Sequence, residues 1–313
     1  TGYEKIIQHL VEANANIEVL DSDGRTPLIW AIISRNTSAV SQMLKAGANV
    51  NQPDLRDIYP LIYSFGMDNP DITRLLINAG ADIDVVLKRS GMNVLMLAAT
   101  QGDTDIIKTL INKGMDVNAK NVAGVTPLML AISENHQAAT ELLINSGAKI
   151  NDISKNGRSA LFTSTGTNIN SDIAKMLIKK GADINVKAKN GMMPLSLAAA
   201  NGNTGVVKVL IEAGLSARGA STEGEFTPLM SASANNRPEV VEQLLSYKVD
   251  IDARDQGGRT ALIWAAKYNC SKCVKLLLTN GANTELFDRQ NKTALDYAKN
   301  NKEIVELFQK QKM

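Results

Sequence analysis

Cysteine, histidine and tryptophan are the side chains of this sequence best suited to chemistry of their own, and the 313-residue chain has only two of each. The cysteines form the run Cys270-Ser271-Lys272-Cys273, whose C-x-x-C spacing suits a redox pair or half of a zinc site. Zinc takes four ligands, and the sequence has neither a second C-x-x-C nor a nearby pair of histidines. A redox or metal protein is therefore one hypothesis, which a reversible disulfide or bound zinc would support.

A structural role explains the same residues more simply. Cys273 falls at a helix position that Ile106 holds elsewhere in the chain, and Cys270 would start that helix. His9 and His136 lie in distant parts of the chain, and His136 falls in a turn between two expected helices. The sequence has no phosphate-cradling loop and no dinucleotide-binding glycine motif. We therefore expect no catalytic residue, no cofactor and no metal.

Composition and charge narrow the class of protein further. The net charge of +2 gives no overall field that would recruit nucleic acid. No apolar run approaches the roughly 18 residues needed to cross a bilayer, and the first ten residues do not resemble a signal peptide. Two cysteines cannot form a disulfide framework, so we expect a cytoplasmic protein, with a signal removed before residue 1 or secretion as an effector left open.

The sequence repeats a short pattern at steps of 33 or 34 residues. A "TPL"-like tripeptide marks each copy, and the longer runs at 24–32 and 258–266 are two copies of one position. The tripeptides are Thr26-Pro27-Leu28, Tyr59-Pro60-Leu61, Asn93-Val94-Leu95, Thr126-Pro127-Leu128, Ser159-Ala160-Leu161, Met193-Pro194-Leu195, Thr227-Pro228-Leu229, Thr260-Ala261-Leu262 and Thr293-Ala294-Leu295.

A second pattern recurs in phase with the first and closes each copy, as in "KAGANVN" at 45–51 and "KKGADIN" at 179–185. Between the two patterns, apolar residues recur at the spacing of an amphipathic helix. Thr caps a first helix, Pro suits its first position, and Gly102 and Gly202 mark the turn to a second helix. A D-x-x-G such as Asp21 to Gly24 predicts a tight turn, so each copy is two helices and a hairpin that must stack on its neighbours.

These two patterns together resemble the ankyrin repeat family over residues 2–313. The resemblance implies an all-α solenoid in which antiparallel helix pairs with hairpin or turn fingers stack into a curved superhelix. It implies protein binding without catalysis. We expect one domain over 1–313, made of an incomplete repeat at 1–20, repeats at 21–53, 54–87, 88–120, 121–153, 154–187, 188–221, 222–254 and 255–287, and a polar capping repeat at 288–313.

The sequence departs from the family pattern in two ways. The position after the tripeptide, which is often His in the family, is mostly apolar here, so we expect apolar packing in place of inter-repeat imidazole hydrogen bonds. The hairpin glycine is replaced by Asp57 and Glu225, and one closing glycine by Lys248, where we expect local irregularity. Trp30 and Trp264 occupy matching positions in the first helix, and we expect them to pack between neighbouring repeats.

The resemblance implies that a partner contacts the hairpin tips and the exposed ends of the first helices, which line the concave groove of such arrays. Apolar tips lie in the middle of the chain and cationic tips toward its ends, which favours a protein or peptide segment with acidic edges. We expect a monomer without specific nucleic-acid binding or membrane insertion. The alternative function is the targeting array of a larger enzyme or secreted effector. The tips are Arg25, Ile58, Met92, Val125, Arg158, Met192, Phe226, Arg259 and Lys292, and the helix-end positions are Ile33, Met67, Gln101, Glu134, Asn201, Asn235, Lys267 and Tyr268.

Overall fold

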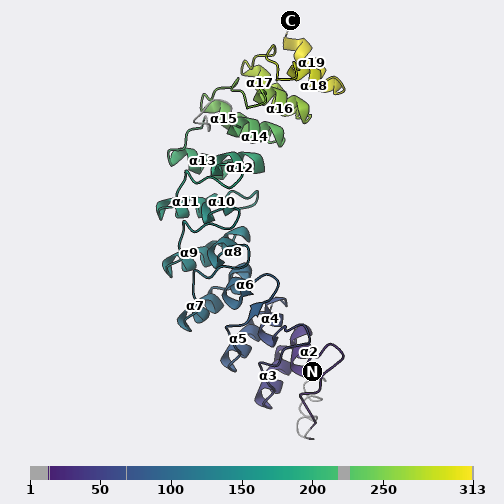
Figure 1. The fold of residues 1–313 in the computed structure, drawn as a ribbon, viewed down its shortest axis with the longest axis vertical. Coiled ribbons are helices and arrows are strands. Elements are labelled where there is room, and N and C mark those ends of the chain that lie inside the picture. The colour runs from purple at the N-terminus through teal and green to yellow at the C-terminus, as the bar shows by residue number, and fades with distance from the viewer. Residues whose placement is uncertain (1–12, 14, 68, 218–225, 312–313) are drawn as a thin grey trace. The chain divides into compact units, whose positions relative to one another are not determined.

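The computed structural model describes residues 13, 15–67, 69–217 and 226–311 (Figure 1). The chain divides into two compact units, residues 1–149 and 150–313, and each is described by itself. The boundary lies inside the repeat expected at 121–153. The organisation as a single domain of ten repeats stays a prediction.

The first unit is a stack of helix pairs. In each pair a first helix precedes a second helix, and first helices pack on first helices while second helices pack on second helices. The elements are α2 (Pro27–Ile33), α3 (Thr37–Lys45), α4 (Pro60–Phe65), α5 (Pro70–Asn78), β1 (Val86–Leu87), β2 (Met92–Asn93), α6 (Val94–Gln101), α7 (Thr104–Asn112), α8 (Pro127–Ser133) and α9 (Gln137–Asn145).

The second unit repeats the same arrangement of paired helices. Its first helices are α10 (Ala160–Thr163), α12 (Pro194–Asn201), α14 (Pro228–Ala234), α16 (Ala261–Lys267) and α18 (Ala294–Tyr297). Its second helices are α11 (Ser171–Lys179), α13 (Thr204–Glu212), α15 (Pro238–Ser246), α17 (Ser271–Thr279) and α19 (Lys302–Gln311). The predicted all-α array of stacked helix pairs is confirmed.

The first helices begin where the tripeptide pattern predicts. The hydroxyl of Thr26 accepts the backbone N–H of Ile29 at 3.2 Å, and Thr126, Thr227 and Thr260 cap their helices in the same way. Such a cap is worth about 1 kcal/mol, because it satisfies a donor that the first turn leaves unpaired. In the last first helix, Asp296 also bonds back to Thr293, which completes a capping box.

The hairpin and closing turns keep one backbone conformation, with or without glycine. Gly24 has φ of 75° and Gly47 has φ of 87°, as the turns require. Asp57 and Lys248 adopt the same left-handed region with φ of 59° and 53°, and their backbone N–H groups make the same turn hydrogen bonds. The expected irregularity is therefore wrong at these two positions, because a non-glycine residue accepts the conformation at a modest energetic penalty. Glu225 lies outside the described residues.

The core is a ladder of equivalent apolar side chains. The leucine of each tripeptide from Leu28 to Leu262 is no more than 2 % exposed. The position that is often His in the family is buried and apolar in most repeats, as Ile29, Met96, Phe162 and Met230 show, so the expected apolar packing is confirmed. Each layer thus buries its apolar face against the next copy.

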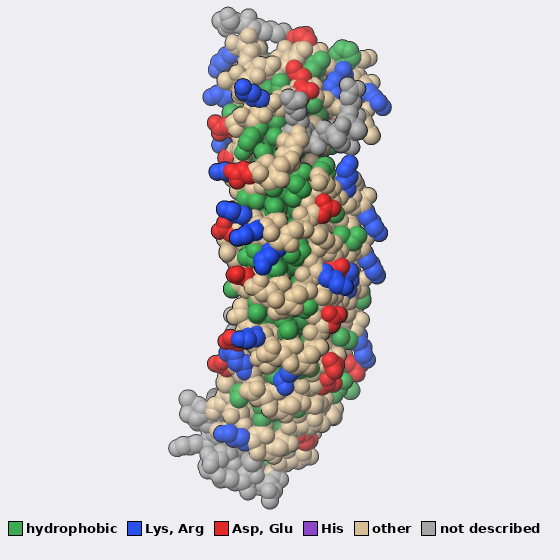
Figure 2. Space-filling view, turned by 90° about the vertical axis from the view of Figure 1, so that its left-hand side faces the viewer, with side chains coloured by type: hydrophobic (Ala, Val, Ile, Leu, Met, Phe, Trp, Pro, Cys, Tyr) green, Lys and Arg blue, Asp and Glu red, His purple; other side chains and the backbone are tan. Residues whose placement is uncertain are grey.

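Backbone hydrogen bonds join neighbouring hairpins at a spacing of one repeat. Leu55 N donates to Asp23 O at 2.9 Å, and Arg289 N donates to Gly257 O at 2.9 Å. Regular strand pairing is limited to β1 and β2, with Val86 opposite Asn93 and Leu87 opposite Met92, among the residues that the structure describes. Most fingers are therefore turns. Figure 2 shows the side of the second helices. Apolar side chains gather along the middle of this side, and charged side chains are more frequent toward its two edges.

Candidate functional site

Four repeats share one hydrogen bond between the hairpin and the first helix. In each, an aspartate that starts the hairpin accepts a hydrogen bond from a Trp or Tyr nine residues later. One carboxylate oxygen takes the aromatic donor, and the other accepts two backbone N–H groups of the turn. The aromatic bonds are Trp30 Nε1 to Asp21 at 2.9 Å, Tyr63 Oη to Asp54 at 2.7 Å, Trp264 Nε1 to Asp255 at 3.0 Å and Tyr297 Oη to Asp288 at 2.6 Å.

These four repeats form two adjacent pairs, one in each unit. The N-terminal cluster is Asp21, Asp23, Arg25, Trp30, Asp54, Arg56 and Tyr63. The C-terminal cluster is Asp255, Arg259, Trp264, Asp288, Lys292 and Tyr297. Each cluster has a Trp repeat followed by a Tyr repeat, so the near-identical runs at 24–32 and 258–266 belong to a larger duplicated arrangement.

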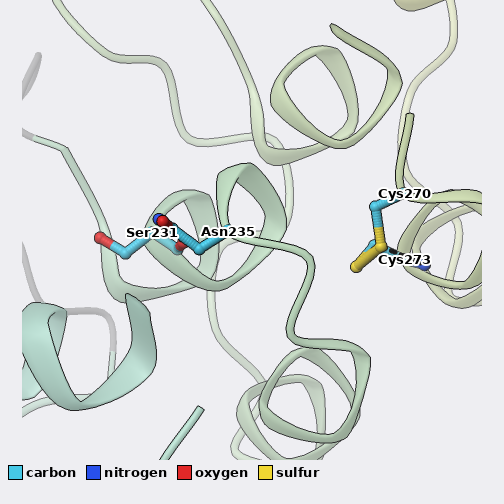
Figure 3. The surroundings of a disulfide bond; sticks show 4 residues. All are labelled: Ser231, Asn235, Cys270 and Cys273. Atoms are coloured by element: carbon cyan, nitrogen blue, oxygen red, sulfur yellow. Dashed lines mark hydrogen bonds between the residues drawn. A yellow bond between two sulfur atoms is a disulfide. The ribbon is translucent and has the colours of Figure 1, made fainter. Parts of the chain in front are cut away.

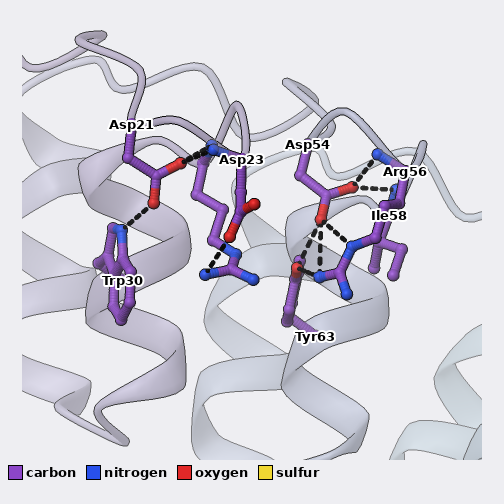
Figure 4. A network of polar contacts seen from close by, with 8 residues as sticks. Asp21, Asp23, Trp30, Asp54, Arg56, Ile58 and Tyr63 are labelled. Carbon is purple, nitrogen blue, oxygen red and sulfur yellow. Dashed lines mark hydrogen bonds and ion pairs between the residues drawn. The ribbon is translucent and has the colours of Figure 1, made fainter.

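Ion pairs join arginines and aspartates of the N-terminal cluster (Figure 4). Arg56 contacts the buried Asp54 carboxylate through Nε at 3.1 Å and Nη2 at 3.0 Å, and its Nη2 also donates to Tyr63 Oη at 2.7 Å. Arg25 pairs with Asp23 at 3.0 Å and lies 5.3 Å from the centroid of Trp30. Burial alone would raise the pKa of Asp54, but the hydrogen bonds from Tyr63, Ile58 and Arg56 outweigh it and lower that pKa.

In the C-terminal cluster, the tryptophan ring is surrounded by other rings and cations. Phe226 meets Trp264 edge-on with centroids 5.2 Å apart, and Tyr268 stacks on Trp264 at 5.7 Å with an interplanar angle of 6°. The guanidinium of Arg259 lies 4.2 Å from the Trp264 centroid, and Lys267 Nζ lies 5.1 Å from it. Phe226 is 40 % exposed and Tyr268 is 53 % exposed, so this ring group faces solvent.

The two tryptophans differ from each other in their described contacts. Trp264 contacts Phe226 of the preceding repeat, so packing between repeats is confirmed there. Trp30 is 45 % exposed, and its described ring and side-chain partners, Arg25 and Asp21, belong to its own repeat. The expected packing of Trp30 between repeats therefore stays a prediction.

Arg259 and Asp255 complete the link between the hairpin and the first helix. Arg259 Nε lies 3.1 Å from the Asp255 carboxylate, which is buried. The Asp288 carboxylate is buried as well, and its hydrogen bond raises the pKa of Tyr297. Burial would raise the pKa of Asp288, but the donation from Tyr297 and the turn N–H groups lowers it. Both carboxylates are thus engaged in hydrogen bonds within the cluster.

The predicted partner-contact residues are only partly brought together. Phe226, Arg259, Lys267 and Tyr268 lie in the contacts just described. The apolar tips Ile58, Met92, Val125 and Met192 are half-buried on four different repeats, Met67 is half-buried on the same repeat as Ile58, and Arg158 and Glu134 are exposed.

The amide side chains among the predicted residues already have backbone partners. Gln101 Nε2 donates to Phe65 O, and Asn201 Nδ2 donates to Thr165 O at 3.0 Å, so both link neighbouring repeats. Asn235 Nδ2 donates to Ser231 O at 2.9 Å within its own helix. Their contact with a partner stays a prediction.

The sequence interpretation missed the carboxylates and tyrosines of both clusters. The signal was present: an Asp lies nine residues before an aromatic residue in four repeats. The first-helix position of Trp30 and Trp264 is Leu, Thr or Ser in the repeats between the clusters, so the aromatic pairs stand apart from the general pattern.

The C-x-x-C holds both structural positions predicted for it and also forms a bond. Cys270 caps α17 and Cys273 lies in its first turn, and both are buried. The two sulfur atoms are joined as a disulfide (Figure 3). The structural role is therefore confirmed, and the redox alternative gains the bond that it requires. Among the described residues, no three His, Cys, Asp or Glu side chains are placed to hold a metal ion.

His136 joins two neighbouring repeats at the turn where the sequence placed it. Its Nε2–H donates to Thr100 O at 2.9 Å, and it begins α9. The ring lies against Gly102, where an added Cβ would be 2.5 Å from the ring Cγ. The predicted turn role is thus confirmed, and His9 lies outside the described residues. No helix in the described part of the chain is long and apolar enough to cross a membrane.

Comparisons with known proteins support the repeat assignment. The family described as ankyrin repeats (3 copies) matches residues 1–54, 61–154, 95–188, 161–255 and 247–312. The crystal structure of the human ASB11 ankyrin repeat domain is similar, with a TM-score of 0.64, 25 % identity and coverage of 69 % of this chain and 96 % of that chain.

Two curated relatives are similar over shorter stretches. Ankyrin repeat domain-containing protein SAT10 of Stachybotrys chartarum is 45 % identical over 56 residues, which is 18 % of this chain and 3 % of the relative. Putative ankyrin repeat protein L271 of Acanthamoeba polyphaga mimivirus is 37 % identical over 73 residues, 23 % of this chain and 10 % of the relative. The aligned stretches thus span a tenth or less of these relatives' lengths. The match to the repeat family extends over nearly the whole sequence, and the chain belongs to the ankyrin repeat family.

Proposed function

We propose that this chain is a non-catalytic scaffold that binds a protein segment through the hairpin tips and first helices. Ankyrin repeats generally mediate protein–protein interactions, and the match extends along nearly the whole chain. The observation that carries the proposal is the solvent-facing ring group of Phe226, Trp264 and Tyr268. Aromatic side chains exposed beside Arg and Lys are typical anchors of protein interfaces.

The second-helix face is the natural comparison for this proposal. Its larger apolar side chains, such as Val207, Leu210 and Leu244, are buried in the stack. Among the described residues with large exposed apolar side chains, Trp30 lies on α2, Phe226 on a hairpin and Tyr268 at the end of α16, whereas Tyr247 lies at the end of the second helix α15. Partner contact at Met92 and Met192 belongs to the same proposal, because these half-buried tips continue the hairpin row.

The alternative function, a targeting array within a larger enzyme or secreted effector, uses the same surface. Both curated relatives are much longer than the stretches that match, which is compatible with this alternative. A monomeric state and a cytoplasmic location stay predictions. Disulfides persist mainly in oxidising compartments, so the Cys270–Cys273 bond weakens the cysteine-based argument for the cytoplasm.

The test is a selection of random displayed peptides against the whole chain, followed by hydrogen–deuterium exchange of the chain with the selected peptides. We expect slower exchange in hairpins and first helices. Replacing Met92, Met192 and Phe226 together by Asp should lower peptide binding at least tenfold with unchanged helicity. The control is Lys108, Lys175 and Lys208 replaced by Asp, since these exposed residues lie on second helices. Protection confined to second helices, or undiminished binding by the first variant, would refute the proposal.

A further inference from the structure

Two lysines near Trp264, Lys267 and Lys292, have no carboxylate paired with them among the described residues. We define the aromatic–lysine patch as Phe226, Trp264, Tyr268, Tyr297, Lys267 and Lys292. We propose that this patch binds an acidic peptide segment in which Asp or Glu flanks an apolar side chain. The inference rests on the proposed function and names the chemistry of its partner.

The rings of the patch provide a continuous apolar contact. Phe226, Trp264 and Tyr268 follow one another at centroid distances of 5.2 and 5.7 Å, and they come from two neighbouring repeats. Stacking holds the Trp264 and Tyr268 rings parallel, so little side-chain freedom is lost when a partner binds. An apolar side chain placed on this layer would remove ring surface from water, which favours binding by about 25 cal/mol for each Å².

The lysines of the patch supply the charge selectivity. Lys267 Nζ lies 5.1 Å from the centroid of Trp264, 5.9 Å from that of Tyr268 and 5.6 Å from that of Tyr297. Lys292 Nζ lies 5.4 Å from the Tyr297 centroid. Within the described residues neither ammonium group forms an ion pair. The two ammonium groups therefore lie beside an aromatic surface with no paired carboxylate in the described part of the chain.

The nearby acidic residues that the structure describes are already engaged elsewhere. Asp255 is buried and accepts hydrogen bonds from Trp264, Arg259 and two backbone N–H groups. Asp288 is buried and accepts from Tyr297 and the turn. Asp296 bonds to Thr293 and pairs with Lys299. Among the described residues, a carboxylate from outside would thus find two cations and no anion paired with them, which is the charge complementarity expected for an acidic segment.

The crowding of the rings favours a peptide over single-stranded nucleic acid. Nucleic-acid platforms stack successive bases on open ring faces. Here Trp264 already contacts Phe226, Tyr268, Arg259 and Lys267. The net charge of the chain, +2, adds no wider electrostatic attraction for phosphates.

The test measures the composition and affinity of peptides that bind the whole chain. We expect peptides selected from a random 12-residue library to be enriched in Asp and Glu beside Leu, Phe or Met. In a Trp30→Phe background Trp264 is the remaining tryptophan, so its emission should change when a synthetic selected peptide binds. Lys267→Glu with Lys292→Glu should weaken that peptide at least tenfold and shift a new selection toward Lys and Arg.

A matched charge reversal on the second helix of the same repeat is the control. Lys272→Glu with Lys275→Glu changes the net charge equally on exposed positions of α17, and should leave affinity within twofold. Equal loss in both double variants, or selected peptides without acidic enrichment, would overturn the inference. If those peptides still protect hairpins and first helices from exchange, the proposed function stands without it. Competition by a labelled 20-nucleotide oligothymidylate at lower concentration than the peptide would also overturn it.

Discussion

Trp30 and Trp264 occupy the same position in two repeats, and both donate their indole N–H to the aspartate nine residues earlier. Their surroundings differ in charge and in ring contacts. At the N-terminal cluster, Arg25 pairs with Asp23 and Arg56 pairs with Asp54. At the C-terminal cluster, Lys267 and Lys292 lie over rings without an ion pair among the described residues.

The bond that both clusters share and the residues in which they differ have separate roles. The bond between Asp and the aromatic residue is common to both clusters, so it serves the fold by tying the hairpin to the first helix. The neighbours of that bond differ, because Ile33 and Ser34 stand where Lys267 and Tyr268 stand seven repeats later. The proposed binding surface therefore differs from its N-terminal counterpart at these two positions of a shared framework, as well as at Phe226 and Lys292.

The largest effect should come from removing the shared carboxylate. Asp54→Ala and Asp255→Ala should each lower the free energy of unfolding by about 2–3 kcal/mol, since each removes a buried acceptor and leaves several half-buried donors without a partner. Asp23→Ala, which removes a carboxylate whose side chain is 57 % exposed, should cost less than about 1 kcal/mol. Urea unfolding followed by circular dichroism measures all three. A difference above about 1 kcal/mol between the two buried aspartates would break the idea of a common framework.

The charge state of Asp54 gives the same prediction a pH dependence. Hydrogen bonds from Tyr63, Ile58 and Arg56 outweigh burial and lower its pKa in the folded chain below the ordinary value of a carboxyl group, so its stabilisation is fully present above that ordinary value and is lost as the pH falls through the lowered pKa. The stability difference between the unaltered chain and Asp54→Asn should therefore shrink on acidification. A difference that grows below pH 4 would contradict this sign.

The next effect concerns the start of the second helix, where the two repeats cap differently. Asn36 Oδ1 accepts Ala39 N at 3.0 Å, whereas the equivalent residues Cys270 and Cys273 form the disulfide. Closing so short a loop is worth about 2 kcal/mol in the chain-entropy description, and an Asn cap restores about 1 kcal/mol. Cys270→Asn with Cys273→Ala should thus unfold about 1 kcal/mol more easily in oxidising urea solutions.

Reductant turns that prediction into a direct comparison. With the disulfide reduced, the unaltered chain loses its cross-link and should become no more stable than the double variant. Unfolding of the double variant should not respond to reductant at all. If the unaltered chain is equally insensitive, and mass spectrometry finds two free thiols under oxidising conditions, the pair acts only as buried helix residues.

The fold could be predicted because its determinants are local and repeated. A cap at Thr26, a glycine at Gly24 and a buried Leu28 each recur at one spacing, so chance matches are excluded by repetition. Asp57 and Lys248, where irregularity was expected, adopt the same turn as the glycines of other repeats, since the stack on both sides fixes the backbone. The lattice thus overrides the preference of a single residue.

The candidate site was harder to predict because it depends on contacts between repeats. Phe226 and Lys267 could be placed on an exposed row from the sequence, but their meeting at Trp264 depends on how side chains of two repeats approach each other. Spacing alone did not distinguish Trp30 from Trp264, whose exposures differ through neighbours 38 or 4 residues away in the second case. The aspartate that bonds each Trp or Tyr could be recognised in the sequence only by comparing the four repeats that have the pair with the other repeats.

The smallest change in stability should come from exchanging two residues between the clusters. Ile33→Lys with Ser34→Tyr gives the N-terminal cluster the ring and the cation of the C-terminal one, and because Ile33 is half-buried and Ser34 exposed it should change stability by less than about 1 kcal/mol. In a Trp264→Phe background, Trp30 emission should move to shorter wavelength as the new Tyr covers the indole. The same variant should gain affinity for acidic peptides selected for binding to the aromatic–lysine patch. Lys267→Ile with Tyr268→Ser should lose that affinity. If the exchange covers Trp30 but brings no affinity, Phe226 or Lys292 is an essential part of the surface, because the exchange supplies neither that ring nor that cation and Ile58 stands at the position of Lys292.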